Sequence, residues 1–185
     1  MTSHKFSALV GTEFVPHTYS NTWQTEKTTG PERLVIAPAS NQIELMIQLA
    51  QVMPEPFGIL YVLLVSRTDN EPGRYQSLNP IPRTEMELFM RGFKEYFESD
   101  GRHHIWLSSV PDSSLLVYDQ HNVIFAYGPL KQFEQILRNQ GLERGDVRFP
   151  DPHAHNYNPE CEQEEQRLLG YWDWLKSPIM PGDNL

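Results

Sequence analysis

The stretch "HHIWLSSVPDSSLLVYDQHNVIFAYG", residues 103–128, contains three short runs rich in aliphatic and aromatic residues. The links "PDS" and "QH" separate these runs, and both are made of residues that favour turns. Such runs joined by tight links predict three consecutive antiparallel strands, a meander. We therefore expect a sheet built around residues 103–127.

A helix is predicted directly before the meander. Thr84 and Glu87 have the spacing of a capping box, in which each side chain bonds a backbone N–H at the start of a helix. Apolar side chains then recur at helical spacing: Met86, Phe89, Met90, Phe93, Tyr96 and Phe97. We expect one helix over 84–99 that packs this face against the sheet.

The remaining elements follow from the same periodicities of two and 3.6 residues. We expect strands at 33–37 and 57–66, a possible edge strand at 145–149, and helices over 40–53, over 129–141 and from Asn158 until before Pro178. This order predicts an α+β fold with a single mixed or antiparallel sheet that contains the three-strand meander. Helices pack on the sheet, and the C-terminal helix docks on the body.

The length of 185 residues fits one domain, so residues 1–185 are expected to form a single domain. Residues 18–32 are polar and rich in threonine, and they are predicted to be an arm that Trp23 pins to the body. Residues 68–82 are rich in Gly, Pro and Asn and predict a mobile loop.

Several classes of protein are disfavoured by composition. Cys161 is the only cysteine, which excludes an intramolecular disulfide and a zinc site built on several thiolates. The first residues lack the features of a signal peptide. The longest apolar run, 57–65, is far shorter than the roughly 20 residues of a membrane-spanning helix. We therefore expect a cytoplasmic protein that does not associate with a membrane.

The formal net charge is −9, and no basic stripe is visible, so nucleic-acid binding is not expected. Acidity concentrates at the C-terminal end, where residues 143–185 contain nine acidic and four basic side chains. This region could attract a basic protein partner. It could also serve only to keep the protein soluble.

The segment "FPDPHAHNYNPECE", 149–162, places His153 and His155 one residue apart. In an extended segment, residues i and i+2 face the same way, so both imidazoles could reach one metal ion. Asp151, or His121 from the meander turn, could supply a third ligand for zinc, iron or manganese. The opposing interpretation is structural, because histidines in such a segment can simply hydrogen-bond it to the sheet. We expect the structural role and no bound metal.

The meander turn also contains Asp119 and His121, which could form a base and its orienting carboxylate. Asp, His and Asn are equally the residues that turn geometry prefers, and two residues apart in a turn they need not touch. Tyr171 and Trp174 are large aromatics near the end of the chain, and they are candidate interface residues. Cys161 is interpreted as a packing residue.

The sequence contains no nucleophile elbow, Walker loop or dinucleotide fingerprint. We therefore expect an acidic cytosolic protein that acts by binding another protein or a copy of itself, without a cofactor. The alternative is a small metal-dependent or acid–base hydrolase that uses His153 and His155, with His121 or Asp151 assisting. The two hypotheses differ in whether His121, His153 and His155 converge in space.

Overall fold

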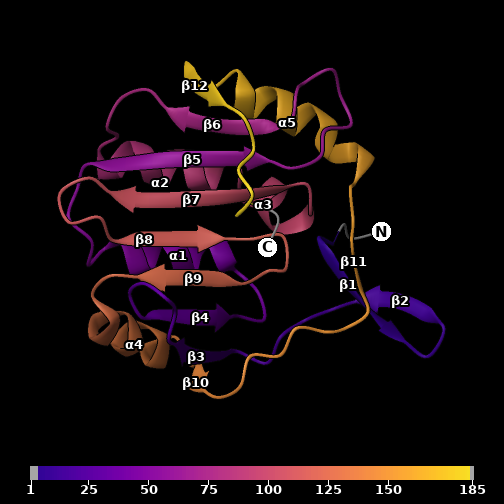
Figure 1. Ribbon diagram of the computed structural model, residues 1–185, viewed down its shortest axis with the longest axis vertical. Helices are drawn as coiled ribbons and strands as arrows, with labels where there is room; N and C mark the ends of the chain where they lie inside the picture. The colour runs from indigo at the N-terminus through magenta and orange to yellow at the C-terminus, as the bar shows by residue number, and fades with distance from the viewer. Residues whose placement is uncertain (1–3, 184–185) are drawn as a thin grey trace.

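The computed structural model describes residues 4–183, and its centre is a large, mainly antiparallel sheet (Figure 1). The nine strands of this sheet are, in spatial order, β10 (Glu143–Arg144), β3 (Thr22–Glu26), β4 (Arg33–Ala37), β9 (Ile124–Tyr127), β8 (Leu115–Tyr118), β7 (His103–Ser109), β5 (Phe57–Leu63), β6 (Gly73–Ser77) and β12 (Trp174–Ser177). Among the strands within residues 4–183, only β10 and β3 pair in parallel. The predicted meander is confirmed as β7–β8–β9 in the middle of the sheet.

Helices cover one face of this sheet. Those found in residues 4–183 are α1 (Gln42–Ala50), α2 (Arg83–Gly92), α3 (Lys94–Ser99), α4 (Leu130–Asn139) and α5 (Glu162–Leu169), with a short 3-10 helix, η1 (Pro159–Cys161), before α5. In Figure 1, α1, α2 and α3 lie behind the strands. Together with one face of the sheet they form the main core, so the expected α+β class is confirmed.

A second sheet of three strands covers part of the opposite face, in the order β11 (His153–His155), β1 (Phe6–Val10), β2 (Glu13–Pro16). Phe6 of this sheet and Tyr19 pack on Val117 and Phe125 of the large sheet in a smaller apolar cluster. The β1–β2 hairpin was not predicted. Its signal is Gly11, which has φ = 65° and turns the chain between two apolar runs.

The helix predicted over 84–99 is in fact two helices, broken at Phe93, whose φ is −116°. All six side chains expected on its inner face are nevertheless buried. Gly92 weakens the helix at this point. Phe93 and Phe97 are four residues apart, and both lie in the core. The buried face therefore continues across the break.

Two segments expected to be irregular contain strands of the large sheet. Residues 18–32 include β3, with Trp23 fully buried, and residues 68–82 include β6. Both strands are second from an edge of the sheet, and each pairs on both sides, β3 with β10 and β4 and β6 with β5 and β12. Their polar composition concealed this, because strand formation here depends on backbone partners that are distant in sequence.

The C-terminal region also differs from the prediction. The last helix ends at Leu169, and Trp174 begins strand β12, which pairs with β6. Without β12, β6 would be an edge strand with unpaired backbone N–H and C=O groups, and β12 forms hydrogen bonds with these groups. The edge strand expected at 145–149 lies earlier in the chain, as β10. At Val147 the backbone N–H donates to the Gln24 side chain and not to the backbone of a neighbouring strand.

None of the helices found in residues 4–183 combines the length and the apolar character needed to cross a bilayer.

Candidate metal centre

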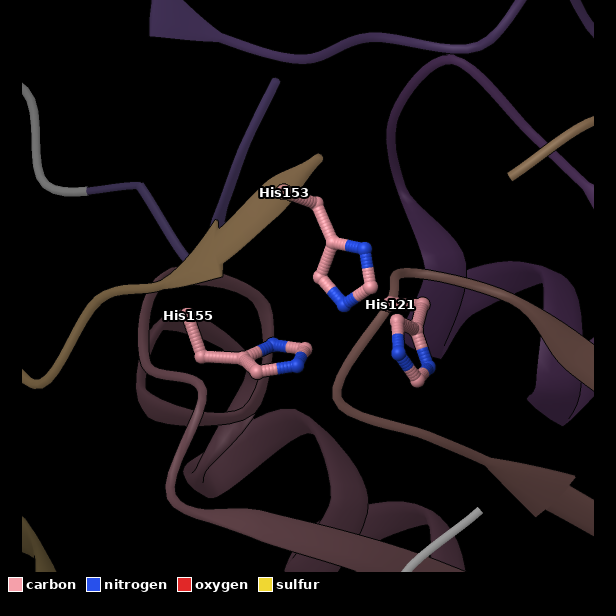
Figure 2. Close-up of side chains that lie close together, drawn as sticks. All are labelled: His121, His153 and His155. Carbon is pink, nitrogen blue, oxygen red and sulfur yellow. The ribbon is translucent and has the colours of Figure 1, made fainter. Parts of the chain in front are cut away.

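Three histidines meet where the small sheet packs against the meander turn (Figure 2). His121 lies in the turn after β8, and His153 and His155 are the two ends of β11. One ring nitrogen from each residue lies within 4.8 Å of those of the other two. The ring centroids are 5.2 Å apart for His121 and His153, 4.8 Å for His121 and His155, and 5.2 Å for His153 and His155. His121, His153 and His155 therefore converge, which is the feature that distinguishes the hydrolase hypothesis from the binding-protein hypothesis.

The strand geometry of β11 brings two of the imidazoles to the same side. Side chains at i and i+2 of a strand share one face, so His153 and His155 both point toward His121. The neighbouring strand β1 pairs Phe6 with His155. The buried Phe6 ring contacts all three imidazoles, at centroid distances of 5.5 Å to His121, 5.3 Å to His153 and 5.6 Å to His155. One side of the cluster is thus closed by an apolar ring.

The Nδ1 atom of each histidine lies beside an oxygen that can only accept a hydrogen bond. His121 Nδ1 is 2.7 Å from Asp119 Oδ2, His153 Nδ1 is 3.0 Å from the Pro150 carbonyl, and His155 Nδ1 is 3.3 Å from the Gln120 carbonyl. Each neutral ring must therefore carry its proton on Nδ1 to make this bond. The lone pair of each Nε2 is then free for a metal ion, as in most histidine metal sites.

Asp119 is the anchor of this arrangement. Its buried carboxylate accepts hydrogen bonds from the backbone N–H groups of His121 and Val123, at 2.9 and 3.1 Å, and from the His121 ring. Burial opposes ionisation of Asp119, but the His121 hydrogen bond and nearby positive charge outweigh it and lower the pKa below its ordinary value. A carboxylate in this position orients His121 and makes its imidazole a stronger ligand.

The charge state of His155 favours metal binding near neutral pH. The pKa of His155 is lowered to about 4, first by burial and then by repulsion from His121 and His153. The ring is therefore uncharged at pH 7, which is the form that binds a metal ion.

A buried ionic network holds the chain that leaves β11. Arg102 is fully buried and pairs with Asp100 at 2.7 Å and with Glu165 of α5 at 2.8 Å. The same guanidinium donates to the Asn158 carbonyl, and the Asn158 N–H donates to Asp100 at 2.7 Å. Sequence reasoning missed this network, because its members are polar residues that are buried only in the folded chain.

The structure brings together some of the predicted site residues and separates others. His121, His153 and His155 converge, whereas Asp151 is exposed and is not part of the set. Asp119 and His121, which need not have touched, form a direct hydrogen bond. The turn role foreseen for Asp119 is also present, in its two backbone hydrogen bonds.

The other candidate residues lie elsewhere. Tyr171 is 43 % exposed, whereas Trp174 is half-buried against the main core. The buried Cys161 packs in that core, and burial raises the pKa of its thiol, which disfavours the reactive thiolate.

Comparisons with models of protein families, with curated proteins and with solved structures find no match to this chain. Function must therefore be inferred from the arrangement of the described side chains.

Proposed function

We propose that this protein binds a divalent transition-metal ion, with zinc as the best fit, through His121, His153 and His155. The observation that carries the proposal is the convergence of three ring nitrogens within 4.8 Å. Zinc–nitrogen bonds of about 2.0–2.1 Å place tetrahedral ligands roughly 3.4 Å apart. Small rotations of the three side chains bridge this difference. Three imidazoles are also a ligand set that selects zinc over magnesium or calcium.

The chemistry that such a site supports is metal-assisted hydrolysis. Three protein ligands leave a fourth position for water, and zinc lowers the pKa of that water to about 7. Asp119 serves as the residue that positions His121, rather than as a ligand. This proposal takes up the hydrolase alternative, with His121 as the third ligand and without Asp151.

The first test is the metal content of untagged protein, measured by plasma mass spectrometry after dialysis against zinc-containing and then zinc-free buffer. We expect about one equivalent of zinc per chain, and visible absorption bands of tetrahedral cobalt after exchange with Co²⁺. The double variant His153→Ala, His155→Ala should lose both signals. The control His4→Ala should retain them, because His4 bonds Ser7 and lies outside the cluster.

A zinc content below about 0.1 equivalent, with no cobalt spectrum, would refute the proposal. In that case the histidines act only as hydrogen-bonding anchors of β11. If metal binds but the loaded protein hydrolyses no activated ester faster than its double variant, the ion is structural.

A second candidate function, self-association, is supported by the β1–β2 hairpin. Four large apolar side chains of this hairpin are exposed: Leu9 (36 %), Val10 (62 %), Phe14 (50 %) and Val15 (36 %). Within the described residues, β2 pairs only with β1, so its outer backbone groups can pair with a second copy of the chain.

Light scattering after gel filtration tests this candidate. The wild-type protein should form a dimer that Phe14→Asp converts to a monomer. The control Leu88→Asp adds the same charge at a position that is 69 % exposed on α2, and it should leave the dimer intact. A monomeric wild-type protein at high concentration would exclude self-association through this hairpin.

A further inference from the structure

The sheet face opposite the helices contains a cavity of about 290 Å³, which is lined by none of the three histidines of the cluster but includes Asp119. Its floor is formed by two cross-strand rows of the meander. Trp106, Val117 and Phe125 make one row, and Leu115 and Tyr127 make the next. Its rim is formed by Pro31, by Ser113 and by Gly182 in the C-terminal segment, which crosses this face in Figure 1.

A positively charged group stands at one end of the cavity. The Arg33 guanidinium lies 4.2 Å from the centroid of the Phe125 ring. Its Nη1 donates to the Tyr127 hydroxyl at 2.8 Å, and its Nε donates to Glu26. Among residues 4–183, no hydrogen bond engages Arg33 Nη2. The head of this side chain thus retains a donor that can meet an anionic oxygen.

Two further polar groups in the cavity wall lack partners. His104 is only 3 % exposed, and its Nε2 makes no hydrogen bond within the described chain. The same holds for Nε1 of Trp106, two residues later on β7. Buried polar atoms in folded proteins are nearly always hydrogen-bonded, so unpartnered ones that line a cavity indicate a missing partner. Asp119, which follows the end of β8, also lines the cavity.

From these features we propose that the cavity binds a small aromatic carboxylic acid. The ring lies on the row formed by Trp106, Val117 and Phe125, where aromatic walls favour a flat apolar body. The carboxylate lies at the Arg33 end, because Arg33 offers the donor that has no partner. The volume of about 290 Å³ is close to the lower limit of small-molecule sites and fits a small ligand.

The test uses the indole N–H signals of ¹⁵N-labelled protein, which contains four tryptophans. Phenylacetate and its uncharged analogue phenylacetamide are titrated separately, and the Trp106 signal is assigned with Trp106→Phe. We expect phenylacetate to shift the Trp106 signal and to bind at least about tenfold more tightly than phenylacetamide, a difference of about 1.4 kcal/mol. Arg33→Gln should remove this preference while phenylacetamide binding stays the same.

Val117→Trp provides a second variant that fills the cavity, and it should abolish binding of both compounds. Leu175→Trp is the matched control, because it adds the same side chain at a position on β12 that is 57 % exposed and outside the cavity. Equal affinities for the acid and the amide would refute the carboxylate assignment. Binding that persists in Val117→Trp, or no Trp106 shift at up to about 10 mM phenylacetate, would refute the site itself. If Arg33→Gln does not fold, the affinities of the wild-type protein for phenylacetate and phenylacetamide still test the carboxylate assignment.

Discussion

Oδ2 of Asp119 lies 2.7 Å from Nδ1 of His121, and the other carboxylate oxygen of Asp119 accepts two backbone N–H groups of the same turn. One buried carboxylate therefore sets both the shape of the turn and the tautomer of the imidazole. This relationship links the local structure of the meander to the proposed metal chemistry.

Asp119→Asn should weaken zinc binding by about 10- to 100-fold. The amide oxygen can still accept the two backbone N–H groups, but the amide NH₂ then faces His121 Nδ1 and drives the ring proton to Nε2, where it blocks the ligand position. Competition with a chromophoric chelator measures the affinity. Asp112→Asn, an exposed turn aspartate of the same meander, is the control and should not differ from wild type. An unchanged affinity in Asp119→Asn would show that Asp119 has no positioning role.

Stability should fall steeply in mild acid. The pKa values of His104 and His155 are lowered from 6.5 to about 4, mainly by burial. Between these pH values the unfolded chain binds more protons than the folded one, so the free energy of unfolding falls as the pH falls. For the almost fully buried His104 the loss is on the order of 3 kcal/mol.

Lys5 extends this dependence to higher pH. Burial lowers its pKa from 10.5 to about 7, against the attraction of Asp119. The unfolded chain again binds more protons between these values, so stability should rise as the pH increases above 7. Urea unfolding in the presence of EDTA, from pH 4.5 to 9, measures both effects. A flat profile would contradict the burial of these three groups.

Arg102→Ala should destabilise the protein by about 3–5 kcal/mol, because it leaves Asp100 and Glu165 buried without their partner. Denaturant unfolding gives the change. Arg148→Ala removes a guanidinium whose side chain is 85 % exposed, and it should change stability by less than about 0.5 kcal/mol. A similarly small effect at Arg102 would mean that water reaches the network.

Phe93→Ala should destabilise the protein by roughly 3–5 kcal/mol, since the ring is buried at the junction of α2 and α3. The control Leu88→Ala changes an exposed side chain of the same helix and should have little effect. Chemical denaturation compares the two. A loss well under 1 kcal/mol at Phe93 would place its ring outside the core.

The sequence by itself determined those elements in which buried apolar residues recur at the spacing of a strand or a helix. The apolar runs of 103–127 specify β7, β8 and β9, and the helical stripe from Met86 to Phe97 specifies the buried face of α2 and α3. In these segments, the apolar face that the residue spacing predicts is also the face that is buried in the folded protein.

Only the tertiary structure decided the elements that depend on a distant partner. β12 is a strand because β6 presents an open edge, and β3 is a strand because β4 lies beside it, although neither segment has a strong strand pattern. The same holds for the candidate site. The spacing of His153 and His155 predicts that both face the same way, but their approach to His121 depends on the pairing of β11 with β1, more than 140 residues away in the chain. Such long-range pairing has no local periodic signal, so the sequence can name the ligands but cannot place them together.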